Sequence, residues 1–303
     1  MKINEIIKSK GLKARGYRKK GKITIIDTVD GKYIYKEGKL NPQILNYLKS
    51  RSFDYMPSFL NSKNETFQLT NYIEGLDIPK EQKILDLVRL TALLHSKTTH
   101  YKEIDLDYYE GIYDDLDNNL NYLYLYYTDL ITLIETKVYM SPSEGLLARN
   151  ITKIYDTIDE NKKRLDKWHT HIKEKRKQRQ VVLHNNLKLD HFLEADSSYL
   201  ISWDKAKVGS PVFDLYKLYQ NHALDFDFEP LLNEYERSYP LMTEEKELLF
   251  ILISQPELIN FNNSEYQNCQ NIGKMIDKIY KTEMFLSPEK SKNTEKEQNH
   301  KYK

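Results

Sequence analysis

The most informative segment of this sequence runs from Ile201 to Leu215 and reads Ile-Ser-Trp-Asp-Lys-Ala-Lys-Val-Gly-Ser-Pro-Val-Phe-Asp-Leu. It continues a β-rich run that begins at Tyr199, and a helical pattern starts near Val212. Between them lie an acid, a glycine and a proline, and the last two residue types interrupt regular structure. The segment therefore predicts a short strand, an acidic loop and a helix that opens with Asp-Leu.

Upstream, residues 180–200 predict a compact β-rich region inserted among helices. Gln180–Leu183 predicts a strand, and the loop sequence Leu-His-Asn-Asn-Leu follows at Leu183–Leu187. Phe192–Leu193 and Tyr199–Trp203 predict two more strands joined by a turn. Elsewhere apolar residues recur with the helical period and predict helices over about 80–95, 105–138, 142–175, 212–224, 229–238, 243–253 and 265–285.

The first 75 residues have a different, β-rich pattern. Two β-rich runs, Lys22–Thr28 and Lys32–Lys36, are separated by Asp30–Gly31, and Asp-Gly between such runs is a strong hairpin signal. We therefore expect a hairpin over about 22–37. The other elements expected here are a polar helix or arm over 1–20, a helix from Asn41–Pro42 and a strand over Glu65–Ile73.

Composition excludes several classes of protein. Lys and Arg number 46 and Asp and Glu number 45, a balance that argues against a protein whose main role is to coat nucleic acid or an anionic membrane. A single cysteine, Cys269, excludes a disulfide framework and a zinc site built on cysteines. No apolar run is long enough to span a membrane, and Met1–Glu5 lacks the apolar stretch of a signal peptide. We therefore expect a cytoplasmic location.

Five segments, in chain order, resemble motifs of the aminoglycoside phosphotransferase and choline kinase family: Lys36, Thr70–Gly75, Leu90–His95, Leu183–Leu187 and Ile201–Leu215. The last match is the most specific, because the residues that fit the family pattern in register are Trp203, Asp204, Ala206, Gly209, Pro211, Asp214 and Leu215. The resemblance covers roughly residues 20–285. The long middle helices are most similar to the spore-coat kinase-like branch of the family.

The resemblance implies an α+β, bilobal protein kinase-like fold with a small β-rich N-terminal lobe and a large, mainly α-helical C-terminal lobe. Residues 1–75 would form the first lobe, with a hinge at about 70–76. Residues 77–286 would form the second, with the catalytic-loop hairpin inserted among its helices. Residues 287–303 contain no aliphatic side chain and predict a disordered tail.

The resemblance also implies cofactors and site residues. ATP and magnesium are the cofactors of such enzymes, with Lys36 in the position of the phosphate-binding lysine and Tyr72 and Ile73 in the hinge at the nucleotide. His184 would hold the catalytic loop by hydrogen bonds, and Asp214 would have a structural role behind it. Kinases pair the lysine with an acid on a helix, but the expected helix from Asn41–Pro42 contains no acid.

Three positions depart from the family pattern together. The catalytic aspartate position carries Asn186, whose amide cannot accept a proton at neutral pH. The position of a magnesium-binding asparagine carries His191, and imidazole suits softer metals. The metal-binding aspartate position carries Ser202. Asp190 and Asp204 are the carboxylates that could bind a metal instead, and Asp204 would share a strand face with Ser202.

Three functional hypotheses follow. The first is a pseudokinase with a degraded active site that binds a protein partner, a nucleotide or another small molecule. The alternative is an active ATP-dependent phosphotransferase for a small hydroxylated substrate, with Asp190 and Asp204 as shifted metal ligands. The third is a structural component of an assembly such as a spore coat, which would place the protein in a spore. None of the three needs nucleic acid or a membrane span.

Overall fold

The structure is a computed structural model that describes residues 3–60 and 66–301. The chain divides into two compact units. The first contains Met1–His100, Gln180–Lys217 and Glu234–Tyr239, and the second contains Tyr101–Arg179, Leu218–Asn233 and Pro240–Lys303. Each predicted lobe is one continuous stretch of the sequence, whereas the first unit combines residues 180–217 with the N-terminal residues. The lobe and hinge boundaries therefore remain a prediction.

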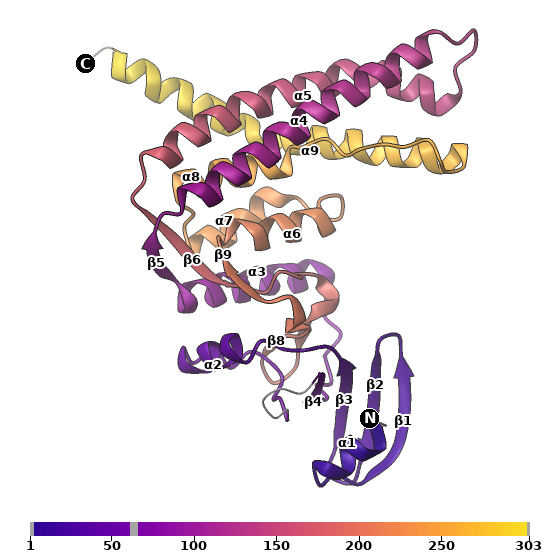
Figure 1. The fold of residues 1–303 in the computed structure, drawn as a ribbon, viewed down its shortest axis with the longest axis vertical. Helices are drawn as coiled ribbons and strands as arrows, with labels where there is room; N and C mark the ends of the chain where they lie inside the picture. The colour runs from indigo at the N-terminus through magenta and orange to yellow at the C-terminus, as the bar shows by residue number, and fades with distance from the viewer. Residues whose placement is uncertain (1–2, 61–65, 302–303) are drawn as a thin grey trace. The chain divides into compact units, whose positions relative to one another are not determined.

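An antiparallel four-stranded sheet forms the N-terminal part of the first unit (Figure 1). Its strands, in spatial order, are β1 (Ala14–Lys20), β2 (Ile23–Thr28), β3 (Lys32–Glu37) and β4 (Phe67–Asn71). The predicted hairpin at Asp30–Gly31 is confirmed as β2 and β3, and the predicted strand that follows is β4. One face of the sheet packs on helix α1 (Ile3–Ser9), with a core of Ile6, Ile7, Ile26, Tyr35, Phe67 and Leu69.

Residues 3–20 differ from the polar helix or arm predicted over 1–20, because strand β1 follows α1; Met1 and Lys2 lie outside the described residues. The sequence of β1, Ala-Arg-Gly-Tyr-Arg-Lys-Lys, has no apolar alternation, and most of its residues are exposed. Its strand conformation comes from pairing with β2, in which Lys20 lies opposite Ile23 and Arg18 opposite Ile25. Cations on an outer strand also oppose pairing with another chain.

The other elements of the first unit surround the segments quoted above. Helix α2 (Pro42–Ser50) begins as predicted, because the Asn41 side chain accepts a hydrogen bond from the Gln43 N–H at 3.0 Å. Helix α3 (Lys80–Thr98) follows β4. The remaining elements are β6 (Lys177–Leu183), η1 (Leu189–His191), β7 (Phe192–Glu194), β8 (Ser198–Leu200), η2 (Trp203–Lys205) and β9 (Lys207–Gly209). Strands β7 and β8 form the predicted hairpin, and β9 pairs with β6.

The predicted strand Tyr199–Trp203 ends early. Strand β8 stops at Leu200, and Ser202 has a left-handed backbone with φ of 66°. The Trp203 indole N–H donates to the Leu200 carbonyl at 2.7 Å, which holds the chain in a turn. Ser202 and Asp204 therefore do not lie on one strand face, and that prediction is wrong.

The second unit is mainly helical. Its helices pack with α5 at the centre, which contacts α4, α8 and α9 (Figure 1). A capping box begins α5, because the side chains of Ser141 and Glu144 accept hydrogen bonds from each other's backbone N–H groups. The remaining elements of the chain are β5 (His100–Glu103), α4 (Leu106–Glu135), α5 (Pro142–Lys173), α6 (Val212–His222), α7 (Phe228–Ser238), α8 (Thr243–Ile253) and α9 (Glu265–Lys301).

Helix α9 continues through most of the segment for which the sequence predicts a disordered tail. Glu and Lys, which are good helix formers, recur through the sequence 287–301 and favour this conformation. Within residues 3–60 and 66–301, no helix combines the length and the apolar character needed to cross a bilayer.

Candidate functional site

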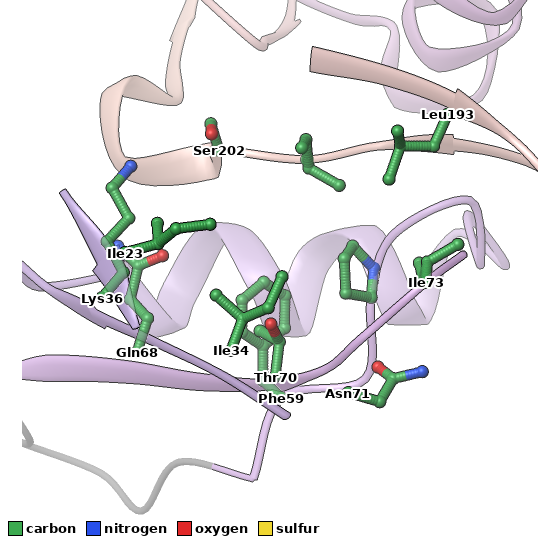
Figure 2. Close-up of a pocket in the computed structure, with 12 residues that line it drawn as sticks. Ile23, Ile34, Lys36, Phe59, Gln68, Thr70, Asn71, Ile73, Leu193 and Ser202 are labelled. Atoms are coloured by element: carbon green, nitrogen blue, oxygen red, sulfur yellow. The ribbon is translucent and has the colours of Figure 1, made fainter. Parts of the chain in front are cut away.

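A pocket opens on the face of the N-terminal sheet that does not pack on α1. It encloses about 550 Å³, part of it open to solvent. Its lining residues are Ile23, Ile34, Lys36, Pro57, Phe59, Gln68, Thr70, Asn71, Ile73, Leu193, Ile201 and Ser202. Figure 2 shows Lys36 and Ser202 at one end of the pocket and Ile73 and Leu193 at the other. A mainly apolar cavity with a few polar groups is typical of a small-molecule site.

Lys36 makes an ion pair at its end of the pocket. Its ammonium lies 2.5 Å from Oδ1 of Asp204, and the two side chains are only 20% and 27% exposed. Burial alone would raise the pKa of the Asp204 carboxyl, but the hydrogen bond and the charge of Lys36 outweigh it and lower that pKa. The acid that α2 lacks is thus replaced, as the partner of Lys36, by an acid from η2.

The two predicted hinge residues separate in the structure. Ile73 lines the pocket, and its backbone N–H and carbonyl make no hydrogen bond with the described residues. Tyr72 instead extends the pairing of the sheet, because its N–H donates to the Lys32 carbonyl at 2.9 Å. The centroid of its ring also lies 5.6 Å from the Lys32 ammonium. Of the predicted nucleotide-binding residues, the pocket therefore brings together Lys36 and Ile73.

A buried carboxylate holds the loop that follows β6. Asp214 is fully buried, and its two oxygens accept the backbone N–H groups of His184 at 2.8 Å and Asn185 at 2.6 Å. The ring of His95 reaches the same carboxylate at 3.2 Å through Nε2, and its Nδ1 lies 2.7 Å from the Tyr235 hydroxyl. Since Asp214 is an acceptor, we assign the proton of His95 to Nε2, so that Nδ1 accepts from Tyr235.

His184 connects this loop to the segment before Ser202. Its Nε2–H donates to the Ile201 carbonyl at 2.8 Å, and its ring meets the Trp203 ring edge to face at 4.9 Å. Nδ1 is buried and has no partner among the described residues. Burial lowers the pKa of His184, in spite of the nearby Asp214, so the imidazole is neutral.

Two residues with left-handed backbones lie where the loops meet. Asn185, in the loop that follows β6, has φ of 57°, and Ser202 has φ of 66°. Asn tolerates this conformation better than most residues, whereas it is strained for Ser. The Asn185 side chain also donates to the Lys205 carbonyl at 3.2 Å, which ties its loop to η2.

The donor set at the expected metal positions does not fit magnesium, which requires hard oxygen ligands in an octahedral arrangement. Nδ1 of His191 donates to the Asn186 carbonyl at 2.7 Å, which leaves only an imidazole nitrogen for a metal. The Asp204 carboxylate is engaged by Lys36, and Asp190 is exposed on η1. Within the part of the chain that the structure describes, no three Asp, Glu, His or Cys side chains gather into a metal site.

Sequence reasoning missed the groups behind the loop and most of the pocket wall. The segment Leu90–His95 resembles a family motif, but the motif does not predict that the His95 ring contacts the Asp214 carboxylate. No local pattern marks Tyr235, whose hydroxyl lies at the other nitrogen of that ring. Part of the pocket wall could have been predicted from the period of two in the strands, because Ile34 and Thr70 neighbour Tyr35 and Leu69, which face α1. The contact of Lys36 with Asp204 had no sequence signal.

Comparisons with known proteins support the predicted family resemblance. A family model described as the phosphotransferase enzyme family matches residues 135–248, less than half of the chain but including the loop at His184 and the segment to Leu215. No curated protein matches the sequence.

Three solved structures have a similar fold. An aminoglycoside phosphotransferase from Alicyclobacillus acidocaldarius aligns with a TM-score of 0.66 and 12% identity over 92% of each chain. A spectinomycin phosphotransferase, solved with ADP and spectinomycin, gives 0.53 and 13% over 93% of this chain and 99% of the other. A choline kinase from Streptococcus pneumoniae gives 0.50 and 17% over 94% and 98%.

The comparisons define the fold of the chain. The chain has the α+β, protein kinase-like fold of aminoglycoside phosphotransferases and choline kinases, with a small antiparallel sheet region at the N-terminus and a large helical region after it. The family resemblance predicted from the five motifs is confirmed. The closer similarity to the spore-coat branch remains a prediction.

Proposed function

We propose that this protein is a pseudokinase that binds a nucleotide and transfers phosphoryl groups slowly or not at all. One observation carries the proposal. An apolar pocket with Lys36 at one end is present, while the neighbouring positions for base and metal carry Asn186, His191 and Ser202.

The pocket has the features that an adenine base requires. Ile23 and Ile34 come from the sheet and Leu193 and Ile201 from the opposite side, so that a flat aromatic ring would be buried between apolar side chains. The backbone N–H and carbonyl of Ile73, which have no hydrogen-bond partner among the described residues, offer a donor and an acceptor at the pocket's other end. The spectinomycin phosphotransferase with a similar fold was solved with ADP, which supports a nucleotide as the ligand.

The weak transfer follows from the altered positions. Loss of a general base costs on the order of 10²–10⁴ in rate, and the amide of Asn186 cannot act as one. Phosphoryl transfer also depends on a metal to neutralise charge on the phosphates. Since the residues around Ser202 and His191 do not fit magnesium, we derive no transfer step through it.

Thermal melting of the purified protein with adenosine, ADP or ATP, each with magnesium and with EDTA, tests the proposal. A ligand at one hundred times its dissociation constant stabilises the native state by about 2.7 kcal/mol, so the melting midpoint should rise. Because the proposed binding needs no metal, the rise should be as large in EDTA as in magnesium. Ile34→Trp fills the pocket and should abolish the rise. Val29→Trp, at the exposed hairpin turn, is the matched control and should keep it.

Two outcomes would overturn the proposal. A rise that requires magnesium, together with phosphate transfer to a small hydroxylated acceptor that is lost in Asp190→Ala or Asp204→Ala, would establish the active phosphotransferase instead. No rise with any nucleotide would exclude the pocket as a nucleotide site and leave a protein partner as the function to search for by pull-down.

A further inference from the structure

The β1 strand presents cations that the proposed function does not yet use. Arg18, Lys19 and Lys20 follow one another along it, and Lys22 comes just after the turn at Gly21. All four side chains are exposed. None of them makes an ion pair with an acid among residues 3–60 and 66–301, so their charge is available to a ligand.

The strand register places two of these cations on the pocket face. Across the sheet, Lys20 lies opposite Ile23, Ile23 opposite Lys36, and Lys36 opposite Gln68. Residues directly opposite in antiparallel strands project from the same face, and three members of this row line the pocket. Lys20 therefore extends the row that contains Lys36.

Arg18 belongs to the next row on the same face. It lies opposite Ile25, which is opposite Ile34, which is opposite Thr70, and the last two line the pocket. Lys19 projects from the other face, because its row contains Tyr35 and Leu69 of the core on α1. Adjacent residues of one strand thus divide into two on the pocket face and one on the α1 face.

The distances are compatible with a shared ligand. Neighbouring strands lie about 4.8 Å apart, so the backbones of Lys20 and Lys36 are separated by about 10 Å across β2. Lysine has a flexible four-carbon stem, and both residues project from the same face. A phosphate chain that leaves the pocket at the Lys36 end would pass within reach of Lys20 and then of Arg18.

A polyphosphate in this pocket needs charge from such a source. The Lys36 ammonium is already paired with Asp204 at 2.5 Å, and the residues near Ser202 and His191 do not fit magnesium. A charged group brought against the apolar wall without a counter-charge is unfavourable. Arg and Lys are the side chains that bind phosphate oxygens most strongly, through charge-assisted hydrogen bonds.

We propose that Lys20 and Arg18 of β1 bind the phosphates of a nucleotide seated in the pocket, in place of a metal ion. This inference rests on the proposed function and specifies its ligand as a nucleoside polyphosphate free of metal. The nucleoside occupies the space between Ile34 and Leu193, and the cations of the outer strand neutralise the phosphates.

Calorimetric titration in EDTA with adenosine, AMP, ADP and ATP tests the inference. In the wild-type protein, affinity should increase with each phosphate and weaken with added salt. The double variant Arg18→Gln/Lys20→Gln should lose on the order of 10-fold in ATP affinity and keep its adenosine affinity. Lys19→Gln, with the same type of charge change on the other face, is the matched control and should change ATP affinity less than 2-fold. Melting of each variant without ligand reports on folding.

The outcomes separate the two proposals. If ATP binds and the double variant behaves like Lys19→Gln, or if ATP binds only with magnesium, the inference is overturned and nucleotide binding stands. Inorganic tripolyphosphate is the second probe: if it binds, loses affinity in the double variant, and adenosine does not bind, the phosphate site is supported and the nucleotide is not. If neither adenosine, ATP nor tripolyphosphate binds, both proposals fail.

Discussion

The loop anchor and the reactive positions of this protein meet at the loop that follows β6 and differ in burial. The anchor consists of Asp214 with His95 and His184, which are fully buried and bonded to one another or to backbone. The reactive positions, Asn186, His191 and Ser202, are partly exposed. The buried side chains of the anchor match the motifs of the predicted resemblance, whereas the positions predicted for the base and the metal ligands depart from them.

The largest expected effect comes from removing the anchor. Asp214→Ala leaves the N–H groups of His184 and Asn185 and the His95 ring without an acceptor in a buried site. We expect the free energy of unfolding to fall by about 3–5 kcal/mol, measured by urea denaturation. Asp190→Ala, an exposed carboxylate in η1, is the control and should change it by about 0.5 kcal/mol or less. Equal effects would contradict the distinction between anchor and reactive positions.

The second prediction concerns pH and the neutral His184. Its pKa in the folded protein lies below the ordinary value of 6.5, so the unfolded chain binds the proton more readily. Its contribution to stability is therefore present above pH 6.5 and is lost as pH falls toward the folded pKa, with a slope of up to about 1.4 kcal/mol per pH unit. Denaturation between pH 8 and pH 5 should show that slope in the wild-type protein.

The variant His184→Gln should remove this part of the pH dependence while keeping a donor for the Ile201 carbonyl. His171→Gln, on a partly exposed histidine of α5, is the control and should retain it. An unchanged slope in His184→Gln would mean that other groups cause the acid sensitivity.

The third prediction restores the reactive positions on the retained anchor. In Asn186→Asp/His191→Asn/Ser202→Asp, carboxylate and amide oxygens return, and Asp accepts the left-handed backbone at 202 better than Ser does. We expect magnesium to tighten ATP binding about 10-fold, close to 1.4 kcal/mol, in titrations with and without EDTA. The double variant Asn186→Asp/His191→Asn is the control, and its ATP affinity should not depend on magnesium. Insensitivity of the triple variant would mean that more than these side chains has been lost.

The smallest effect is expected from Asp204→Asn, which neutralises the partner of Lys36. A partly exposed ion pair contributes about 0.2–1 kcal/mol, so stability should change little. The freed ammonium and the loss of a nearby negative charge should raise ATP affinity about 2- to 5-fold at low salt, measured by titration. Asp196→Asn, an exposed acid in the β7–β8 turn, should have no effect. A decrease in affinity would show that Asp204 binds the ligand or its metal directly.

Much of the fold could be predicted because its signals are local. The Asp30–Gly31 turn, the Asn41 cap and the Ser141–Glu144 capping box each specify an element through a few neighbouring residues. Strand β1 could not be predicted, since its strand conformation depends on hydrogen bonds to β2 and not on its own pattern. The left-handed turn at Ser202 was missed for a different reason: the hydrogen bond from Trp203 to Leu200 is local, but the β-rich run that contains it predicts a continuous strand.

The sequence by itself determined the class of fold and predicted the positions at which a kinase-like site would lack its base and metal ligands, because both predictions use residue type and spacing alone. Only the tertiary structure decided which side chains meet. The pairing of Lys36 with Asp204, the support of the loop by His95 and Asp214, and the row that joins Lys20 to Lys36 involve residues distant in sequence or set by strand register. Such contacts depend on how elements pair and pack, which local patterns do not encode.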